Sequence, residues 1–293
     1  FAANPRTIRL AAGTGSATDA RVDLQSVASV VGQRVAVATV VNASGAERMR
    51  LENGRIVSAE LDPLRRMPGV VSVLTAKDIP GTNDWGPVTH DDPILAEGIV
   101  NYLGQPVFAV LDDTADAARR AAARAKEVLR IDPLPAILTP EQAHAAQSYV
   151  VPPMHMVRET HGGAQAAIAA APHKLSGRLD VGGQEQFYLE GQVAYAIPTE
   201  RDGVHLYSST QHPSEMQTLV AHMLGRPVHQ IVCECRRMGG GFGGKESQSA
   251  VFACIAALAC ARLQRPVKLR ADRDDDFLIT GKRHDALYRY EAG

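Results

Sequence analysis

The run from Ala250 to Ala261 is apolar at all 12 positions, and it constrains the fold more than any other stretch of the chain. A membrane-spanning helix needs about 20 such residues, so this run predicts a helix buried inside a folded domain. A helix that is apolar on nearly every side must be covered by neighbouring elements on more than one side. The residues before and after it, 228–238 and 266–270, read as strands, and we therefore expect a helix packed against a sheet.

Composition limits the class of protein and its partners. The chain has 293 residues, 45% hydrophobic and 22% charged, which is typical of a globular protein with one large or two ordinary domains. The formal net charge of -1 predicts no general attraction to nucleic acid or to an anionic membrane. The first residues lack the pattern of a signal peptide, so we expect none, and the four cysteines lack the spacing of zinc or redox sites. We expect a cytoplasmic protein with reduced cysteines.

The pattern of predicted strands and helices divides the chain into four parts. An N-terminal segment has weak signals apart from a strand at 34–42, and it precedes a small α+β domain. A connector with little periodicity follows, and then a second domain begins. The bounds of the four parts are 1–54, 55–140, 141–170 and 171–293.

The first domain is predicted from strands that flank an alanine-rich helix. The stretch 70–79, which Pro80 and Gly81 end, and the stretch 105–111 read as strands. In residues 112–129, apolar positions recur at helical spacing, and Asp113 is a suitable N-cap for the predicted helix. The stretch 134–138 is expected to close this domain as a strand.

The second domain has clear turn and cap signals. A hairpin precedes a helix within 212–227, for which Ser214 and Gln217 predict a capping box and Gly225 a C-terminal cap. After a further strand and a glycine-rich loop, the apolar helix is expected to begin at Glu246. Its N-terminus would then point toward the loop.

The glycine loop, Gly239–Gly244, matches parts of two nucleotide-binding motifs. A phosphate-binding P-loop needs Ser or Thr after its lysine to ligate magnesium, but Glu246 follows Lys245 here, and its carboxylate would repel a nucleotide. The dinucleotide motif needs an acidic residue about 20 positions on, and residues 247–271 contain none. We therefore expect no nucleotide. The glycines let the backbone approach a bulky ligand and leave N–H groups free, and a tight turn without a ligand is the alternative.

Several motifs in order resemble one family. The runs "GGQEQFYLEGQ" (182–192), "SSTQHPSEMQ" (208–217) and "RMGGGFGGKE" (237–246) resemble the molybdenum-binding subunit of xanthine dehydrogenase, and 272–284 continues the match. Upstream, "MPGVVSVLTAKDIPG", "YLGQPVFAVL" and "LPAIL" resemble the α/β hammerhead domain of that family. The resemblance covers roughly 55–293. It implies an α+β fold in which the hammerhead domain is followed by the start of a molybdopterin-binding α+β domain.

The resemblance implies which residues bind the molybdenum–molybdopterin cofactor. Gln211 corresponds to a glutamine whose side chain bonds to an oxygen on molybdenum, and Phe242 to a residue whose backbone N–H contacts the oxo ligand. The neighbouring glycines Gly240, Gly241 and Gly243 are expected to pack near the pterin. Because the metal is held by the sulfurs of the pterin, no cluster of cysteine or histidine is required. The alternative for Gln211 is an ordinary loop glutamine.

Glu246 bears on the substrate. By resemblance it corresponds to a glutamate that hydrogen-bonds a purine, and a carboxyl group can pair with the N–H groups of a purine edge. Facing an apolar aldehyde, a buried carboxylate would be left unpaired at a cost of a few kcal/mol. The oxidative hydroxylation of hypoxanthine or xanthine towards urate is therefore favoured, with an aldehyde-oxidising member of the same superfamily as an alternative. A solvated carboxylate without a function is the other interpretation.

The resemblance also implies partners. Electrons are expected to leave through iron–sulfur and FAD centres on partner subunits or domains. The general base of the family is expected in the C-terminal half of the molybdenum subunit, beyond Gly293. We therefore name no catalytic residue in this chain, and we expect the chain alone to be incomplete and inactive. A non-catalytic truncated fragment or assembly module is the alternative to a part of a purine hydroxylase.

Overall fold

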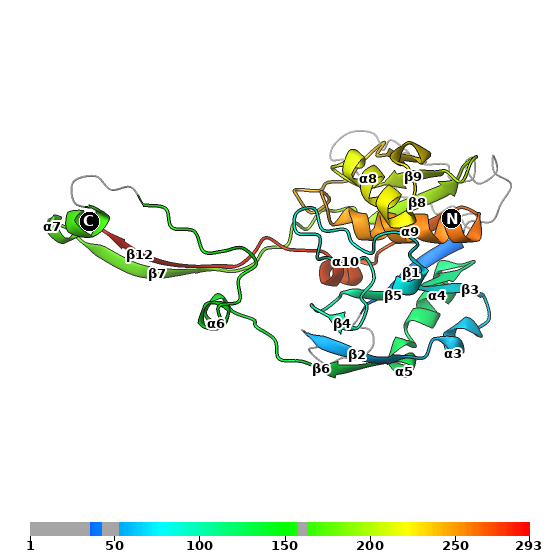
Figure 1. Ribbon diagram of the computed structural model, residues 1–293, viewed down its shortest axis with the longest axis horizontal. Coiled ribbons are helices and arrows are strands. Elements are labelled where there is room, and N and C mark those ends of the chain that lie inside the picture. The colour runs from blue at the N-terminus through cyan, green and yellow to red at the C-terminus, as the bar shows by residue number, and fades with distance from the viewer. Residues whose placement is uncertain (1–35, 43–52, 158–162) are drawn as a thin grey trace, which may run out of the picture. The chain divides into compact units, whose positions relative to one another are not determined.

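The computed structural model describes residues 36–42, 53–157 and 163–293 (Figure 1). It divides into compact units: unit 1 combines the described residues up to Leu134 with Phe187–Thr280, and unit 2 combines Pro135–Gln186 with Gly281–Gly293. The strands are β1 (Ala36–Asn42), β2 (Gly54–Ala59), β3 (Val70–Thr75), β4 (Ile99–Val100), β5 (Pro106–Asp112), β6 (Leu129–Pro133), β7 (Leu175–Val181), β8 (Val193–Pro198), β9 (Val204–Ser208), β10 (Ile231–Glu234), β11 (Val267–Arg270) and β12 (Ala286–Ala292). The helices are α3 (Asp62–Arg65), η1 (Ala76–Asp78), α4 (Ala115–Ala122), α5 (Ala125–Val128), α6 (Pro140–Ala145), α7 (Gly163–Ala170), α8 (Pro213–Leu224), η2 (Val228–Gln230), α9 (Ser249–Leu263) and α10 (Arg273–Ile279).

One mixed sheet forms the frame of unit 1. Within the described residues it has seven strands in the order β10-β9-β8-β11-β1-β5-β3. Neighbours are antiparallel except for the pairs β9–β10 and β1–β11, which are parallel. β1 therefore joins β5 and β3 to β11 and β8, so that segments far apart in the sequence share one sheet. The strand predicted at 34–42 is confirmed as β1.

The apolar run forms the centre of the core. Every side chain of α9 from Ser249 to Cys260 is buried. The helix packs against β8, β9 and β11 and against α8 (Figure 1). The prediction of a buried helix on a sheet is confirmed. Its expected start at Glu246 is wrong, because residues 242–248 form turns and bends and the helix begins only at Ser249.

A second cluster of buried side chains lies between β5, α4 and the small sheet β4-β2-β6. Here two expectations are corrected. Thr114 rather than Asp113 caps α4, since its Oγ1 accepts a hydrogen bond from the Ala117 N–H at 3.2 Å. The closing strand is β6 rather than 134–138, because the chain passes directly from α5 into β6, where Leu129 and Ile131 are buried in this cluster.

The C-terminal end of α8 is capped as predicted from the sequence, whereas its N-terminal end is not. Gly225 has φ of 62° and ends the helix in the left-handed conformation, as expected. The capping box is wrong: the N-cap is His212, and among the described residues no side chain caps the helix. Gln217 does not turn back to the helix start, because its Nε2 donates to the Ile231 carbonyl oxygen at 2.6 Å. The predicted hairpin is confirmed by β8 and β9, in which Tyr195 lies opposite Tyr207.

Unit 2 contains an antiparallel ribbon of β7 and β12, in which Leu179 lies opposite Tyr288. The short helices α6 and α7 lie at or within the predicted connector. Thr139 caps α6 by accepting a hydrogen bond from the Gln142 N–H at 3.2 Å. The connector is therefore less irregular than its sequence suggested.

Candidate cofactor-binding site

The glycine loop connects β10 to α9 and has an unusual backbone. Gly240, Phe242 and Gly243 have φ angles of 95°, 52° and 86°, in the left-handed region. Glycine adopts such angles without strain, whereas for Phe242 the cost is roughly 1–2 kcal/mol. The Phe242 side chain is nevertheless 76% exposed. A strained backbone at an exposed aromatic residue is typical of a functional loop.

The loop presents unused hydrogen-bond donors. Within the described part of the chain, the N–H groups of Gly240, Gly241 and Phe242 have no acceptor, whereas the next N–H group, that of Gly243, donates to the Gln211 Oε1 at 2.9 Å. Consecutive N–H groups in turns that include left-handed residues can bind anions and oxo groups. The loop can thus donate hydrogen bonds to a ligand rich in acceptors.

Gln211, predicted from the sequence as a site residue, lies directly against this loop. It precedes α8, and its Oε1 accepts hydrogen bonds from the N–H groups of Gly243 at 2.9 Å and Lys245 at 3.3 Å. Its own N–H donates to the Lys245 carbonyl oxygen at 2.7 Å. A Cβ atom on Gly241 would lie 2.4 Å from the Gln211 Oε1, so only glycine allows this contact. Among the described residues the Gln211 Nε2 has no acceptor, and it remains available to a ligand.

Lys245 cannot act as the lysine of a P-loop. Its side chain is 0% exposed, and its Nζ lies 3.1 Å from the Glu190 Oε1 and 2.7 Å from the Ser209 Oγ. The Nζ also lies 4.7 Å from the centre of the Tyr188 ring. Burial lowers the pKa of Lys245, and the Glu190 carboxylate opposes that shift. A lysine held in this way is not free to reach a phosphate group.

A buried polar network supports the other side of the loop. Asp276 accepts hydrogen bonds from the Tyr188 hydroxyl at 2.5 Å and from the Gln192 N–H at 2.8 Å. The Gln192 Nε2 in turn donates to the Gly244 carbonyl oxygen at 3.0 Å. Burial, and then the hydrogen bond to Asp276, raises the pKa of Tyr188. Sequence reasoning did not assign these residues a role, although each lies in a motif that carries the family resemblance.

Glu246 lies in the same segment but faces solvent. Its side chain is exposed, and no partner of its carboxylate is found among the residues that the structure describes. It lies outside α9, which begins at Ser249, so it is not part of a first helical turn. The structure therefore brings Gln211, the glycine loop and Glu246 together in one region of unit 1.

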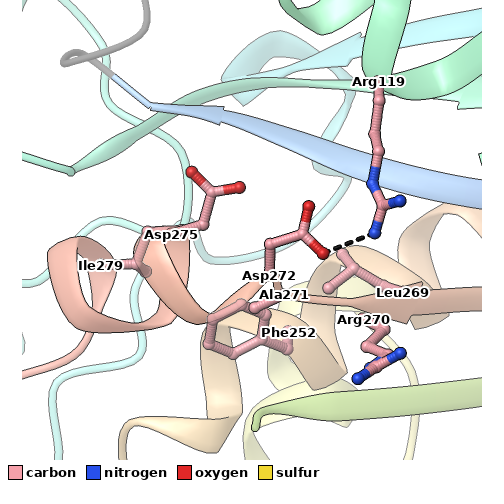
Figure 2. Close-up of a pocket in the computed structure, with 8 residues that line it drawn as sticks. All are labelled: Arg119, Phe252, Leu269, Arg270, Ala271, Asp272, Asp275 and Ile279. Atoms are coloured by element: carbon pink, nitrogen blue, oxygen red, sulfur yellow. Dashed lines mark hydrogen bonds and ion pairs between the residues drawn. The ribbon is translucent and has the colours of Figure 1, made fainter. Parts of the chain in front are cut away.

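A pocket of unit 1 that lies away from the glycine loop in the sequence is too small for a cofactor. It has a volume of about 20 Å³ and lies between α4 and the start of α10, where Arg119 pairs with Asp272 (Figure 2). Such a volume holds about one water molecule. In the described ranges, no group of three His, Cys, Asp or Glu side chains is placed to hold a metal ion. All four cysteines, each within the described residues, are free.

No helix in the described ranges is long and apolar enough to cross a membrane.

Comparisons with known proteins agree with the motifs. Residues 148–293 match the model of a molybdopterin cofactor-binding domain, and residues 50–129 match the aldehyde oxidase and xanthine dehydrogenase a/b hammerhead domain. The chain is 43% identical to a xanthine dehydrogenase of Drosophila subobscura over 239 residues, which are 81% of this chain and 18% of that relative. The chain belongs to the xanthine dehydrogenase and aldehyde oxidase family.

Other family members show the same extent of similarity. Aldehyde oxidase 2 of Cavia porcellus is 39% identical over 242 residues, which are 82% of this chain and 18% of that protein. The chain thus spans less than a fifth of the length of these curated relatives. Among solved structures, the aldehyde oxidoreductase of Desulfovibrio gigas matches with a TM-score of 0.72 and 25% identity over 88% of this chain and 29% of that one. The expected α+β fold, a hammerhead domain and a molybdopterin-binding domain, is confirmed.

Proposed function

We propose that this family member forms part of the molybdopterin-binding site of an enzyme that hydroxylates hypoxanthine or xanthine towards urate. The observation that carries the proposal is the row of unused N–H groups on Gly240, Gly241 and Phe242, next to the Gln211 side chain. An anionic group with oxo ligands and a pterin is bulky and rich in acceptors, and this donor loop suits it.

The residues of the chain would hold and orient this group. The N–H groups of the loop and the Gln211 Nε2 would donate to its oxygens, and the absence of side chains at Gly240, Gly241 and Gly243 would let the pterin approach the backbone. When bound, the cofactor supplies the two-electron oxidation that adds an oxygen atom to the purine ring. Preorganised donors of this kind stabilise negative charge without reorganising during the reaction.

Glu246 favours a purine over an aldehyde as substrate. Its exposed carboxylate has no partner among the described residues, so it can accept hydrogen bonds from the N–H groups of a purine edge. Sequence identity does not separate the two substrates, because the xanthine dehydrogenase and the aldehyde oxidase named above are 43% and 39% identical to this chain. An aldehyde-oxidising enzyme remains the second candidate.

The proposal includes the rest of the enzyme. We assign the general base to another part of the molybdenum subunit, and the iron–sulfur and FAD centres to partner subunits or domains. We also propose a cytoplasmic location, because composition and cysteine usage suit one.

The test is to purify the protein with the chains that accompany it and to measure molybdenum, pterin and xanthine-dependent dye reduction. We expect molybdenum and pterin in equal amounts, together with turnover of xanthine. The Gln211→Ala variant should lower turnover of xanthine and of an aldehyde alike, while Gln165→Ala on the exposed face of α7 should change neither. A folded protein that binds its partners but contains neither molybdenum nor pterin would refute the proposal in favour of an assembly module.

A further inference from the structure

We propose that Glu190, Ser209 and Lys245 form a clamp that positions the glycine loop, and that these are positioning residues for the anionic ligand. This inference rests on the proposed function for the identity of the ligand. The clamp itself is defined by contacts at Gly239 and Lys245, which precede and follow the unused N–H groups in the sequence.

The clamp fixes the beginning of the loop through both oxygens of Glu190. The Oε2 accepts a hydrogen bond from the Gly239 N–H at 2.9 Å. The Oε1 lies 3.1 Å from the Lys245 Nζ and also accepts a hydrogen bond from the Ser209 hydroxyl. The Ser209 Oγ in turn accepts a hydrogen bond from the Lys245 Nζ at 2.7 Å. The backbone adds a bond from the Glu190 N–H to the Gly239 carbonyl oxygen at 3.3 Å.

The other end of the loop is fixed by Gln211, which accepts hydrogen bonds from the N–H groups of Gly243 and Lys245. The N–H groups of Gly240, Gly241 and Phe242 lie between these two anchored points. A span of three residues held at both ends has few conformations, so its N–H groups keep one direction. This is the preorganisation that an anionic ligand requires.

Stability alone does not explain an ion pair at this position. The Lys245 side chain is completely buried, and removing such a charge from water costs several kcal/mol. Because the Glu190 side chain is 36% exposed, solvent weakens the attraction that would offset this cost. The pair is better explained by the geometry that it imposes on Gly239.

The test uses two double variants of the full protein, Glu190→Gln/Lys245→Met and Glu190→Met/Lys245→Met. Both lack the two charges of the pair, of which only that of Lys245 is completely buried, so neither leaves one charge without its partner. Only the glutamine keeps a side-chain oxygen for the Gly239 N–H. The readout is amide hydrogen exchange at Gly239 and Gly244, with the amides of α9 as the control for an intact fold.

We expect exchange at Gly239 to be about 10-fold faster in the Glu190→Met double variant than in the Glu190→Gln double variant, with α9 unchanged in both. Molybdenum retained per chain should fall in the methionine variant and be largely kept in the glutamine variant. Equal exchange in the two variants, with α9 intact, would overturn the clamp.

Should both double variants lose the protection of α9, Ser209→Ala decides the question, because it removes only a neutral hydroxyl between the two charges. Faster exchange at Gly239 supports the clamp, and unchanged exchange overturns it. The exchange measurement needs neither molybdenum nor purine. A native protein without molybdenum would therefore refute the proposed function, while the exchange rates would still decide whether the clamp exists.

Discussion

Under the proposed function, the exposed carboxylate of Glu246 selects a purine over an aldehyde. In an enzyme that contains this chain, Glu246→Ala should lower the rate constant for xanthine about 10- to 150-fold, because a hydrogen bond to a charged group contributes roughly 1.5–3 kcal/mol. An aldehyde has no ring N–H groups for the carboxylate, so its turnover should change little. Comparing kcat/KM for xanthine and an aldehyde checks this, with the exposed Glu97→Ala as control. Equal losses for both substrates would show that Glu246 does not contact the purine.

We expect Lys268 on β11 to make the free energy of unfolding depend on pH. Burial, with a smaller effect of Arg270, lowers its pKa from 10.5 to about 8. Between these values the unfolded chain carries a proton that the folded chain has lost, so the free energy of unfolding rises with pH in this window. Lys268→Met should remove this contribution, which is at most about 3 kcal/mol. Urea unfolding of the native protein and of the Lys268→Met variant between pH 7 and pH 10.5 checks this. If the free energy of unfolding changed with pH in the same way in both proteins, the prediction would be contradicted.

The individual residues of the site were only partly predictable. Motif matching proposed Gln211, Phe242 and Glu246 as site residues, because each lies in a short continuous run. It gave no role to Glu190, and it interpreted Lys245 only as part of a P-loop pattern. Their pairing joins positions that are 55 residues apart in the sequence, and no local pattern reports such a contact.

In the glycine loop, Gly241 leaves no room for a side chain next to Gln211. An added Cβ would lie 2.4 Å from the Gln211 Oε1, so Gly241→Ala must displace the loop or the glutamine. Losing such hydrogen bonds should weaken cofactor binding by about 10-fold or more. Molybdenum retained per chain is the measurement, and Gly182→Ala is the control because nothing lies within 4 Å of its added Cβ. Equal retention in both variants would show that the loop does not hold the cofactor.

Local sequence signals predicted most elements but missed several of their ends. The apolar run predicted α9, and Gly225 predicted the C-terminal end of α8. Both predictions rest on short stretches of sequence, an apolar pattern in one case and a glycine cap in the other. The alanine-rich run suggested one helix, yet α4 and α5 are separate. Ala125 and Val128 are buried beside β6 in a cluster that also includes the β5 side chains. Helix propensity is a local property and does not predict such packing against other elements.

At the scale of the whole molecule, unit 1 joins the two segments that the family models separate. β3 and β5 belong to the hammerhead match and β8–β11 to the molybdopterin-binding match, yet β1 unites them in one sheet. Ion pairs such as Arg119–Asp272 and Arg265–Asp113 also connect the two segments. These pairs are at least partly exposed, and each contributes about 1 kcal/mol or less, so the shared sheet and core carry the connection.

A shared sheet implies that unit 1 unfolds in one cooperative step. Phe108 is buried in the cluster around α4, and Phe252 is buried in the cluster around α9. Replacing either by alanine should lower the free energy of unfolding by about 3–5 kcal/mol, and both variants should shift the same transition.

Urea unfolding followed by the fluorescence of Trp85, the single tryptophan of the chain, and by circular dichroism can report this transition. The two probes should coincide in every variant, whereas Val88→Ala, at a side chain that is 82% exposed, should leave the midpoint unchanged. Separate transitions, with each phenylalanine variant moving only one of them, would mean that the hammerhead and molybdopterin-binding segments fold independently despite the strand that they share.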